Sequence, residues 1–150
     1  MSFFPRRGKD SANAKWGVEN AVMAGNYVIS HSSQLIASLH NNEATKIMSK
    51  IIDDLIHGEL CQLESVSSTH QARYNQYLNK TYLKTASLIA NSCETIALVN
   101  DAPPNVQKAA YYFGRYLGMA FQIQDDRLDF IANSAQLGKV RVVFFLTYAR

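Results

Sequence analysis

Apolar residues recur at three- and four-residue spacing along most of the chain, which is the period of an amphipathic α-helix. The spacing predicts a first helix from about Trp16 to Leu39, ended by the polar run His40-Asn41-Asn42. A second helix is predicted from about Glu43 to Leu63, where two adjacent apolar rows form the wide stripe typical of a helix packed in a core. The rows are Ile47, Ile51 and Leu55, and Met48, Ile52 and Ile56.

Two more helices are predicted in the second half of the chain. After a loop over Ser65 to His70, the third helix is expected from about Ala72 to Val99, and it stops at the breaker Asn100-Asp101-Ala102-Pro103-Pro104. Pro104 is expected to open a fourth helix that runs to about Ile131 and is apolar on more than one side, as a central helix wrapped by neighbours would be. The inner side of the third helix is expected to carry Tyr74, Leu78, Thr85, Leu88, Ile89, Cys93 and Ile96.

The end of the chain does not continue this helical pattern. Residues 140–150, VRVVFFLTYAR, form a β-branched and aromatic run with the profile of a strand or an aggregation-prone segment. No internal repeat or low-complexity stretch is visible before it. The sequence therefore predicts an all-α domain over residues 1–139 and a divergent tail over residues 140–150.

Composition and charge exclude several classes of protein. A net charge of +3 with dispersed Lys and Arg does not make the concentrated basic stripe of a nucleic-acid-binding surface, so no nucleic-acid partner is expected. The two cysteines, Cys61 and Cys93, are far apart, which argues against a disulfide scaffold and a cysteine-rich zinc site. No apolar run approaches the roughly 18 residues of a membrane span. The start, MSFFPRRGKD, resembles neither a secretory signal nor a transit peptide.

The segment FQIQDDRLDF, residues 121–130, places Asp125, Asp126 and Asp129 close together on the fourth predicted helix. Like charges one helical turn apart destabilise an exposed helix by roughly 0.2–0.5 kcal/mol. A solvated helix face is one interpretation, but the apolar and aromatic neighbours favour a half-buried site. An EF-hand loop is excluded because its glycine and glutamate are missing. Carboxylates at this spacing can instead hold one or two Mg²⁺ ions that take their other ligands from waters and phosphate oxygens.

Four segments together resemble the all-trans polyprenyl diphosphate synthases. FQIQDDRLDF followed by Gly138-Lys139 is similar to the family's second aspartate-rich motif. The other segments are Arg6-Arg7-Gly8-Lys9, similar to the basic pair after the first DDxxD motif, AVMAGNYVIS at residues 21–30, similar to AxxAGDxLLS, and Lys84-Thr85-Ala86-Ser87-Leu88, similar to KTAxL. On KTASLIANSCE and GELCQL, the chain most resembles the catalytic subunit of the decaprenyl and solanesyl synthases that make the ubiquinone side chain.

This resemblance implies a fold and an activity. The fold would be an isoprenoid synthase-type helical bundle that encloses a deep apolar cavity. The activity would be that of a Mg²⁺-dependent prenyltransferase, which ionises an allylic diphosphate, adds isopentenyl diphosphate head-to-tail to the cation and then loses a proton. A mitochondrial location is implied, and so is a homodimer or a hetero-oligomer with a second synthase subunit. The broad apolar stripes agree with such a partner, because an isolated monomer would expose them.

The resemblance also implies roles for individual residues. The implied Mg²⁺ ligands are Asp125, Asp126 and Asp129. The implied catalytic residues beside the reacting carbons are Lys84, Thr85 and Gln122. The implied substrate-binding residues are Arg6, Arg7, Lys84, Gln122 and Lys139. Glu59 is a weaker candidate, because it stands where many relatives have a Gln close to the cation.

The chain also departs from the family pattern. No DDxxD precedes Arg6, Asn26 stands where the family usually has Asp, and residues 140–150 replace the expected helical continuation. We therefore expect the chain to be truncated at both ends, so that residues 1–139 form a partial synthase domain. Two alternatives are a catalytically inactive helical partner of an intact synthase subunit and a terpenoid cyclase, although cyclases usually lack the RRGK and KTAxL segments.

Overall fold

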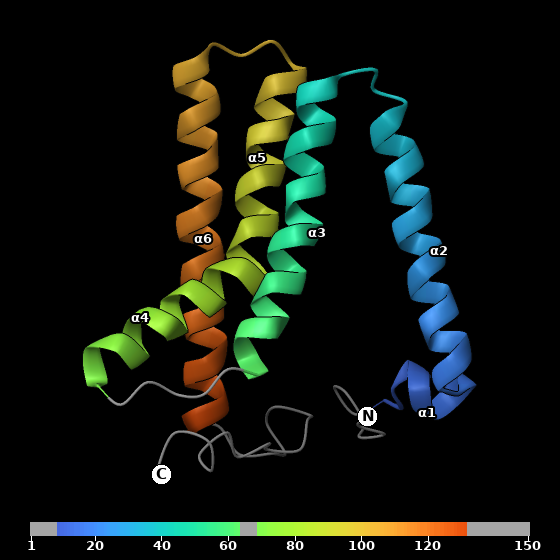
Figure 1. Cartoon of the computed structure of the whole chain (residues 1–150), viewed down its shortest axis with the longest axis vertical. Coiled ribbons are helices and arrows are strands. Elements are labelled where there is room, and N and C mark those ends of the chain that lie inside the picture. Colours follow the sequence, from blue (N-terminus) through green and yellow to red (C-terminus); the bar gives the residue numbers. More distant parts are fainter. Residues whose placement is uncertain (1–8, 64–68, 132–150) are drawn as a thin grey trace. The chain divides into compact units, whose positions relative to one another are not determined.

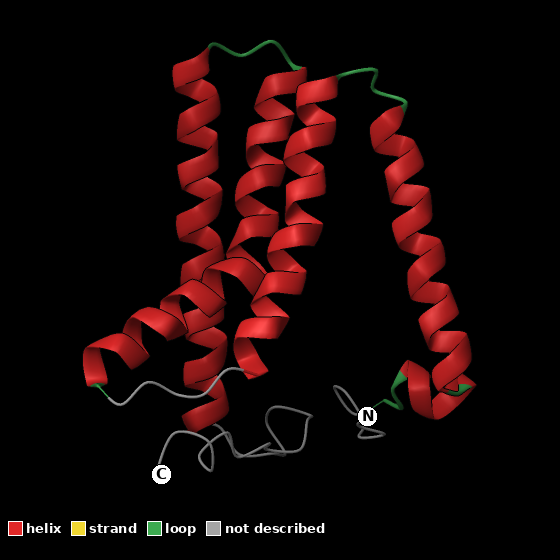
Figure 2. Ribbon diagram, viewed as in Figure 1, coloured by secondary structure: helices red, strands yellow, loops and turns green. Residues whose placement is uncertain are grey.

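The computed structural model describes residues 9–63 and 69–131, and all of the elements assigned within these ranges are helical (Figure 2). The elements are α1 (Ala12–Trp16), α2 (Val18–Ala37), α3 (Asn42–Leu63), α4 (His70–Thr81), the π-helical turn η1 (Tyr82–Ala86), α5 (Ser87–Val99) and α6 (Pro104–Ile131). They divide between two compact units. The first is Met1–Ser38 with Arg127–Arg150, and the second is Leu39–Asp126. The predicted all-α fold class is confirmed, while the predicted tail over 140–150 lies outside the described residues.

The first unit contains α1 and α2, which the sequence predicts as one helix starting near Trp16. Ser11 caps α1 by accepting a hydrogen bond from the Ala14 amide at 3.3 Å. Gly17 then adopts a φ of 81°, a left-handed value that an L side chain would disfavour, and this separates the two helices. The predicted helix is therefore interrupted at its first turn. Like the other helices in the described ranges, α2 does not combine the length and apolarity needed to cross a bilayer.

The second unit begins with α3, whose start and end agree with the prediction to within one residue. The Asn41 side chain accepts a hydrogen bond from the Ala44 amide at 3.0 Å at the helix start. Both predicted apolar rows are only partly covered. In the first row Ile51 is buried whereas Leu55 is exposed, and in the second row Ile52 and Ile56 are exposed. The wide stripe predicted for α3 is thus a narrow buried seam against η1 and α5.

The third predicted helix is α4, η1 and α5 in succession, and Figure 1 shows α4 and α5 running in different directions. A π-helical turn holds an extra residue and rotates the helix after it by about 100°. The predicted inner side is wrong at Leu88 and Ile96, which follow the turn, and at Tyr74, which precedes it, since all three are more than half exposed. The other predicted inner residues, Leu78, Thr85, Ile89 and Cys93, are half-buried. The buried side carries Thr81, Leu83, Ala86, Ser87, Ala90, Asn91 and Thr95.

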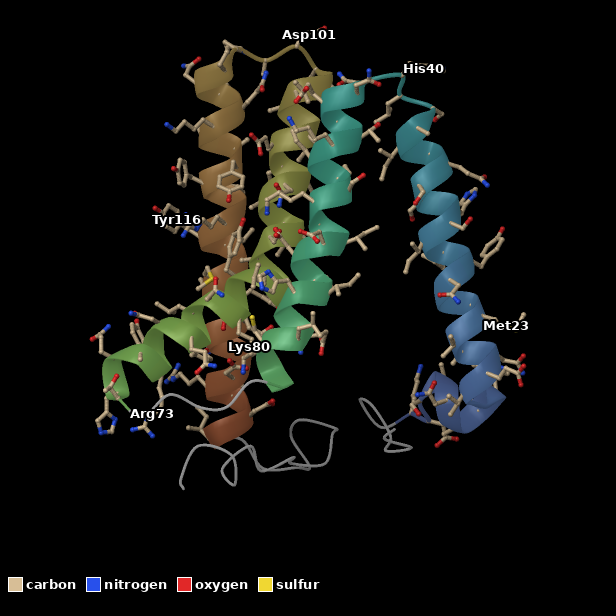
Figure 3. The ribbon with its side chains drawn as sticks, in the orientation of Figure 1. Met23, His40, Arg73, Lys80, Asp101 and Tyr116 are labelled. Carbon is tan, nitrogen blue, oxygen red and sulfur yellow. The ribbon has the colours of Figure 1, made fainter. Side chains whose placement is uncertain are left out.

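The fourth predicted helix is confirmed as α6, which lies beside α5 (Figure 1). Its contact surface is glycine rather than large apolar side chains. A Cβ on Gly114 would lie 2.6 Å from the Ile89 carbonyl oxygen, and one on Gly118 would lie 2.6 Å from Ala86 Cα. The expectation of a central helix covered on several sides is not met, because Phe113 and Phe121 are more than 60% exposed. Tyr116 likewise projects away from the neighbouring helices (Figure 3).

This close contact predicts a loss of stability when Gly114 is changed to Ala. The new methyl group would meet backbone atoms of Ile89 and Ala90, which cannot move aside as a flexible side chain can. We expect the free energy of unfolding to fall by about 1–3 kcal/mol, measured by urea unfolding followed by circular dichroism. Gly25→Ala is the matched control, because nothing lies within 4 Å of its Cβ position. A Gly114→Ala chain as stable as the control would contradict the close packing.

Candidate functional site

The acidic segment lies near the end of α6, where its carboxylates are half-buried as expected. Asp126 accepts two hydrogen bonds, one on each oxygen. The Tyr77 hydroxyl on α4 donates to Oδ2 at 2.7 Å, and the Gln122 amide donates to Oδ1 at 2.9 Å. Asp125 precedes Asp126 on the helix, and Asp129 lies one turn beyond Asp125. The Asp126 carboxylate is therefore held in one orientation from two directions.

The hydrogen-bond chain continues from α6 to the π-helical turn. Gln122 accepts a hydrogen bond from the Thr85 hydroxyl at 2.8 Å on its amide oxygen, while its amide nitrogen donates to Asp126. These hydrogen bonds connect the side chains of Thr85, Gln122, Asp126 and Tyr77 in that order, and they join three helical elements, η1, α6 and α4. Two of the predicted catalytic residues and one of the predicted metal ligands are brought together, although they are up to 41 positions apart in the sequence.

Lys84, the third predicted catalytic residue, lies next to Thr85 in η1 and faces α3. Its ammonium nitrogen is 2.9 Å from a carboxylate oxygen of Glu59, and the Lys84 side chain is 32% exposed. The turn approaches α3 closely at Gly58, where an added Cβ would lie 2.9 Å from Lys84 Cγ and 3.0 Å from Leu83 Cβ. Gly58 therefore allows η1 to pass close to α3, and it sets Lys84 beside Glu59.

Sequence reasoning placed most of these residues but did not identify Tyr77. Tyr77 has no local signal, because its partner Asp126 is 49 positions away. Three predicted substrate-binding residues, Arg6, Arg7 and Lys139, lie outside the described residues. Glu59, a weaker candidate, forms an ion pair with Lys84, and its predicted place near the cation stays a prediction.

The acidic residues suit one side of a Mg²⁺ site rather than a whole one. Within residues 9–63 and 69–131, no three His, Cys, Asp or Glu side chains gather as a metal-binding group. Each oxygen of Asp126 accepts a hydrogen bond, and a carboxylate oxygen has a second lone pair. Mg²⁺ prefers oxygen ligands, keeps several waters and often uses one or two carboxylates together with substrate phosphates. The donor set on α6 fits that mode of binding.

Comparison with known proteins gives a family match and relatives among the polyprenyl diphosphate synthases. Residues 4–142 match the polyprenyl synthetase family. The human all trans-polyprenyl-diphosphate synthase is 42% identical over 134 residues, which cover 89% of this chain and 32% of that protein. The mitochondrial solanesyl-diphosphate synthase 1 of rice, Oryza sativa subsp. japonica, is also 42% identical over 134 residues, covering 89% of this chain and 31% of that protein. The chain thus spans about a third of the length of these relatives.

The fold is shared with solved structures of the same kind. Heptaprenyl diphosphate synthase from Staphylococcus aureus is similar with a TM-score of 0.80 and 33% identity, over 89% of this chain and 42% of that one. The match runs through the segments that carry the hydrogen-bond chain from Thr85 to Asp126, since the family match spans residues 4–142. On this sequence and structural evidence, the chain belongs to the polyprenyl synthetase family.

Proposed function

We propose that this chain handles the diphosphate groups in the reaction of the polyprenyl diphosphate synthases, in which isopentenyl diphosphate is added head-to-tail to an allylic diphosphate. The product would be the polyprenyl side chain of ubiquinone, a proposal supported by a decaprenyl-diphosphate synthase subunit and a mitochondrial solanesyl-diphosphate synthase among the relatives. We place the chain in mitochondria on the same ground. Its proposed partners are a second copy or a second synthase subunit.

The observation that carries this proposal is the hydrogen-bond chain from Thr85 through Gln122 to Asp126. It ties the turn with the lysine to the helix with the aspartates, so a diphosphate can meet an ammonium group and the carboxylates together. The Gln122 amide accepts a hydrogen bond from Thr85 and donates one to Asp126, so its orientation is defined. The side chains are therefore preorganised, as is required for catalysis that depends on the positioning of reacting groups.

The proposed chemistry assigns each residue a physical task. Bound Mg²⁺ would neutralise charge on the departing diphosphate. Asp125, Asp126 and Asp129 would hold that ion, and the Lys84 ammonium would stabilise the negative charge that develops as the C–O bond breaks. The dipoles of Thr85 and Gln122 would face the allylic cation, while apolar helix walls exclude water from it.

A prenyl transfer assay distinguishes this function from its alternative. The alternative is a catalytically inactive helical partner of an intact synthase subunit, and the exposed Phe113 and Phe121 on α6 favour some covering partner. Purified chain is incubated with Mg²⁺, farnesyl diphosphate and radiolabelled isopentenyl diphosphate. Product that disappears on adding EDTA supports a synthase acting by itself. Mg²⁺-dependent diphosphate binding without product supports a chain that contributes one side of a synthase site, and we expect this result because α6 supplies the acidic side chains from one side only. A chain that neither binds diphosphate nor forms product supports the inactive partner.

Tyr77 supplies a test of the site that does not change a charge. Tyr77→Phe removes the hydroxyl that donates to Asp126 at 2.7 Å, so the carboxylate is less firmly oriented. We expect affinity for Mg²⁺ with inorganic diphosphate, measured by calorimetric titration, to fall about tenfold. Tyr74→Phe is the matched control, because Tyr74 lies on the same helix and is 57% exposed. Equal affinities of the two variants would show that Tyr77 does not act on the site.

A further inference from the structure

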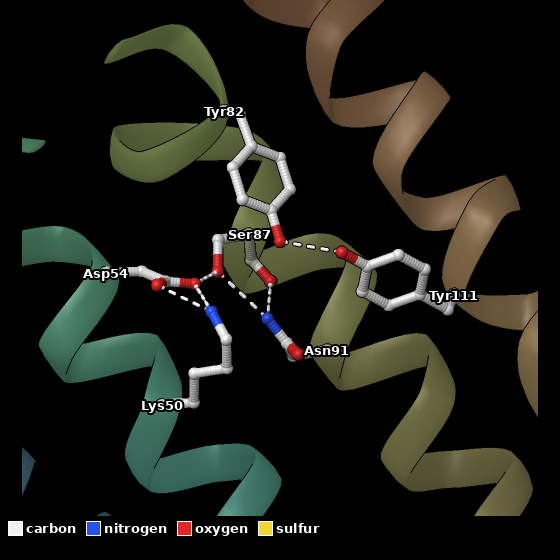
Figure 4. A network of polar contacts seen from close by, with 6 residues as sticks. All are labelled: Lys50, Asp54, Tyr82, Ser87, Asn91 and Tyr111. Carbon is white, nitrogen blue, oxygen red and sulfur yellow. Dashed lines mark hydrogen bonds and ion pairs between the residues drawn. The ribbon is translucent and has the colours of Figure 1, made fainter. Parts of the chain in front are cut away.

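The π-helical turn that carries Lys84 and Thr85 is held by polar contacts at both ends. At its first residue, the hydroxyls of Tyr82 and Tyr111 are 2.7 Å apart, which joins η1 to α6 (Figure 4). Burial and the hydrogen bond with Tyr82 raise the pKa of Tyr111 above its ordinary value, so its hydroxyl stays protonated. Directly after the last residue of the turn, Ser87 joins α5 to α3. These contacts leave Lys84 and Thr85 between two fixed points.

The contact at Ser87 belongs to a network of four residues, of which Asp54, Ser87 and Asn91 are buried and Lys50 is 53% exposed (Figure 4). The Ser87 hydroxyl donates to Asp54 on α3, and the Asn91 amide donates to the Ser87 carbonyl at 2.8 Å and to its hydroxyl at 2.9 Å. Lys50 reaches the same carboxylate, at 2.6 and 2.5 Å from its two oxygens. Asp54, Ser87 and Asn91 are all buried. Every contact made by Ser87 is therefore shielded from water.

This burial makes the network rigid for an energetic reason. A buried carboxylate is costly unless it is paired and hydrogen-bonded, so Asp54 strongly disfavours any movement that would separate it from Ser87 or Lys50. Gly58 lies one helical turn after Asp54, at the place where α3 meets Leu83 and Lys84. Two successive turns of α3 thus contact this region. Asp54 binds Ser87, directly after η1, and Gly58 packs against Leu83 and Lys84 of η1.

The turn needs such support because π-helical geometry is rare and is intrinsically less favourable than α-helix, although it recurs at functional sites. We propose that Asp54 and Ser87, together with Tyr111 at the other end, are positioning residues that hold η1 in the shape that presents Lys84 and Thr85 to a diphosphate. The diphosphate in this inference rests on the proposed function. The control of the turn by the network rests on the contacts alone.

The test separates a positioning role from a purely structural one by using matched losses of a hydroxyl. Ser87→Ala removes the contact beside η1. Thr95→Val removes a hydroxyl that is also buried, and that donates to the Asn91 carbonyl at 2.8 Å about two turns farther along α5. Two measurements are made on each chain, hydrogen exchange by mass spectrometry for a peptide over residues 82–87, and calorimetric titration with inorganic diphosphate and Mg²⁺.

In Ser87→Ala, we expect exchange over residues 82–87 to be about tenfold faster and diphosphate affinity to fall about tenfold, as one lost hydrogen bond allows. Thr95→Val should change neither the exchange rate nor the diphosphate affinity, even if it lowers the unfolding midpoint of the protein as much as Ser87→Ala does. Asp54→Asn keeps an oxygen that can accept from Ser87 but loses the charge that pairs with Lys50, so its exchange should lie between those of the wild type and Ser87→Ala, whereas Asp54→Leu should behave like Ser87→Ala.

A second pair of variants tests the other end of the turn without opening the core. Tyr111→Phe removes the hydroxyl that contacts Tyr82, and Tyr112→Phe is its control on the next residue, which is 38% exposed. Faster exchange over residues 82–87 in Tyr111→Phe alone supports the proposal. Equal exchange within each pair, Ser87→Ala with Thr95→Val and Tyr111→Phe with Tyr112→Phe, overturns it. If the wild type binds no diphosphate, the proposed function fails, and the exchange rates decide the positioning role by themselves.

Discussion

Replacing Asp125 and Asp126 together with Ala is expected to lower Mg²⁺-dependent affinity for diphosphate about a hundredfold, or ~2.7 kcal/mol. In the proposed site the two carboxylates would supply oxygen ligands for Mg²⁺, and Asp126 is held in one orientation by Tyr77 and Gln122. Without them, the ion stays hydrated in solution and the diphosphate meets only basic side chains. The measurement is a calorimetric titration of inorganic diphosphate in Mg²⁺, repeated in EDTA.

The control for this experiment removes the same amount of charge elsewhere on the same unit. Asp53→Ala with Glu43→Ala takes two carboxylates from α3, where both residues are exposed. This control should bind diphosphate like the wild type if local coordination matters, because exposed charges at a distance are largely screened at physiological salt. A similar loss of affinity in both double variants would indicate a general electrostatic effect and would count against a metal site on α6.

Lys84→Gln and Glu59→Gln are expected to change diphosphate affinity in opposite directions. Lys84 is a cation held by the π-helical turn, and its removal should weaken binding about tenfold, as loss of a charge-assisted contact does. A carboxylate oxygen of Glu59 lies 2.9 Å from the same ammonium and would compete with a bound diphosphate for it. Its neutralisation should leave Lys84 more available and should strengthen binding about twofold to threefold, the range for a partly exposed ion pair.

A second lysine and glutamate pair on α3 provides the matched control. The Lys46 ammonium nitrogen is 3.8 Å from a carboxylate oxygen of Glu43, and both side chains are more than 60% exposed. Lys46→Gln and Glu43→Gln should leave diphosphate affinity unchanged. The competition between Glu59 and the ligand would be refuted by a Glu59→Gln chain that binds diphosphate more weakly than the wild type.

Local signals account for the parts of the fold that were predicted well. The boundaries of α3 and α6 follow from apolar spacing, from the Asn41 cap and from Pro103-Pro104 at the start of α6, all of which act within a few residues. The separate short helix α1 depends on a left-handed Gly17, and a glycine in a sequence does not by itself show whether φ is positive. Such a break was therefore not predicted.

Non-local contacts account for what could not be predicted. The π-helical turn looks like ordinary helix in the sequence. Its first residue contacts Tyr111, and Ser87, directly after it, contacts Asp54, so each partner is more than 20 positions away. Because the turn rotates the helix after it, the buried side of α5 was assigned incorrectly. The aspartates, Lys84, Thr85 and Gln122 were found through motif resemblance, whereas Tyr77 acts only through a contact made in the folded chain.

The central claim is that the aspartates of α6 and the turn at Lys84 and Thr85 bind one metal–diphosphate together. The most direct measurement is paramagnetic broadening in the ¹⁵N NMR spectrum of the chain, with Mn²⁺ replacing Mg²⁺ and inorganic diphosphate as the ligand. We predict broadened amide signals at Asp125, Asp126, Lys84 and Thr85, with sharp signals at Lys46. Broadening that is uniform along the chain, or that affects α6 but not the turn, would contradict the account.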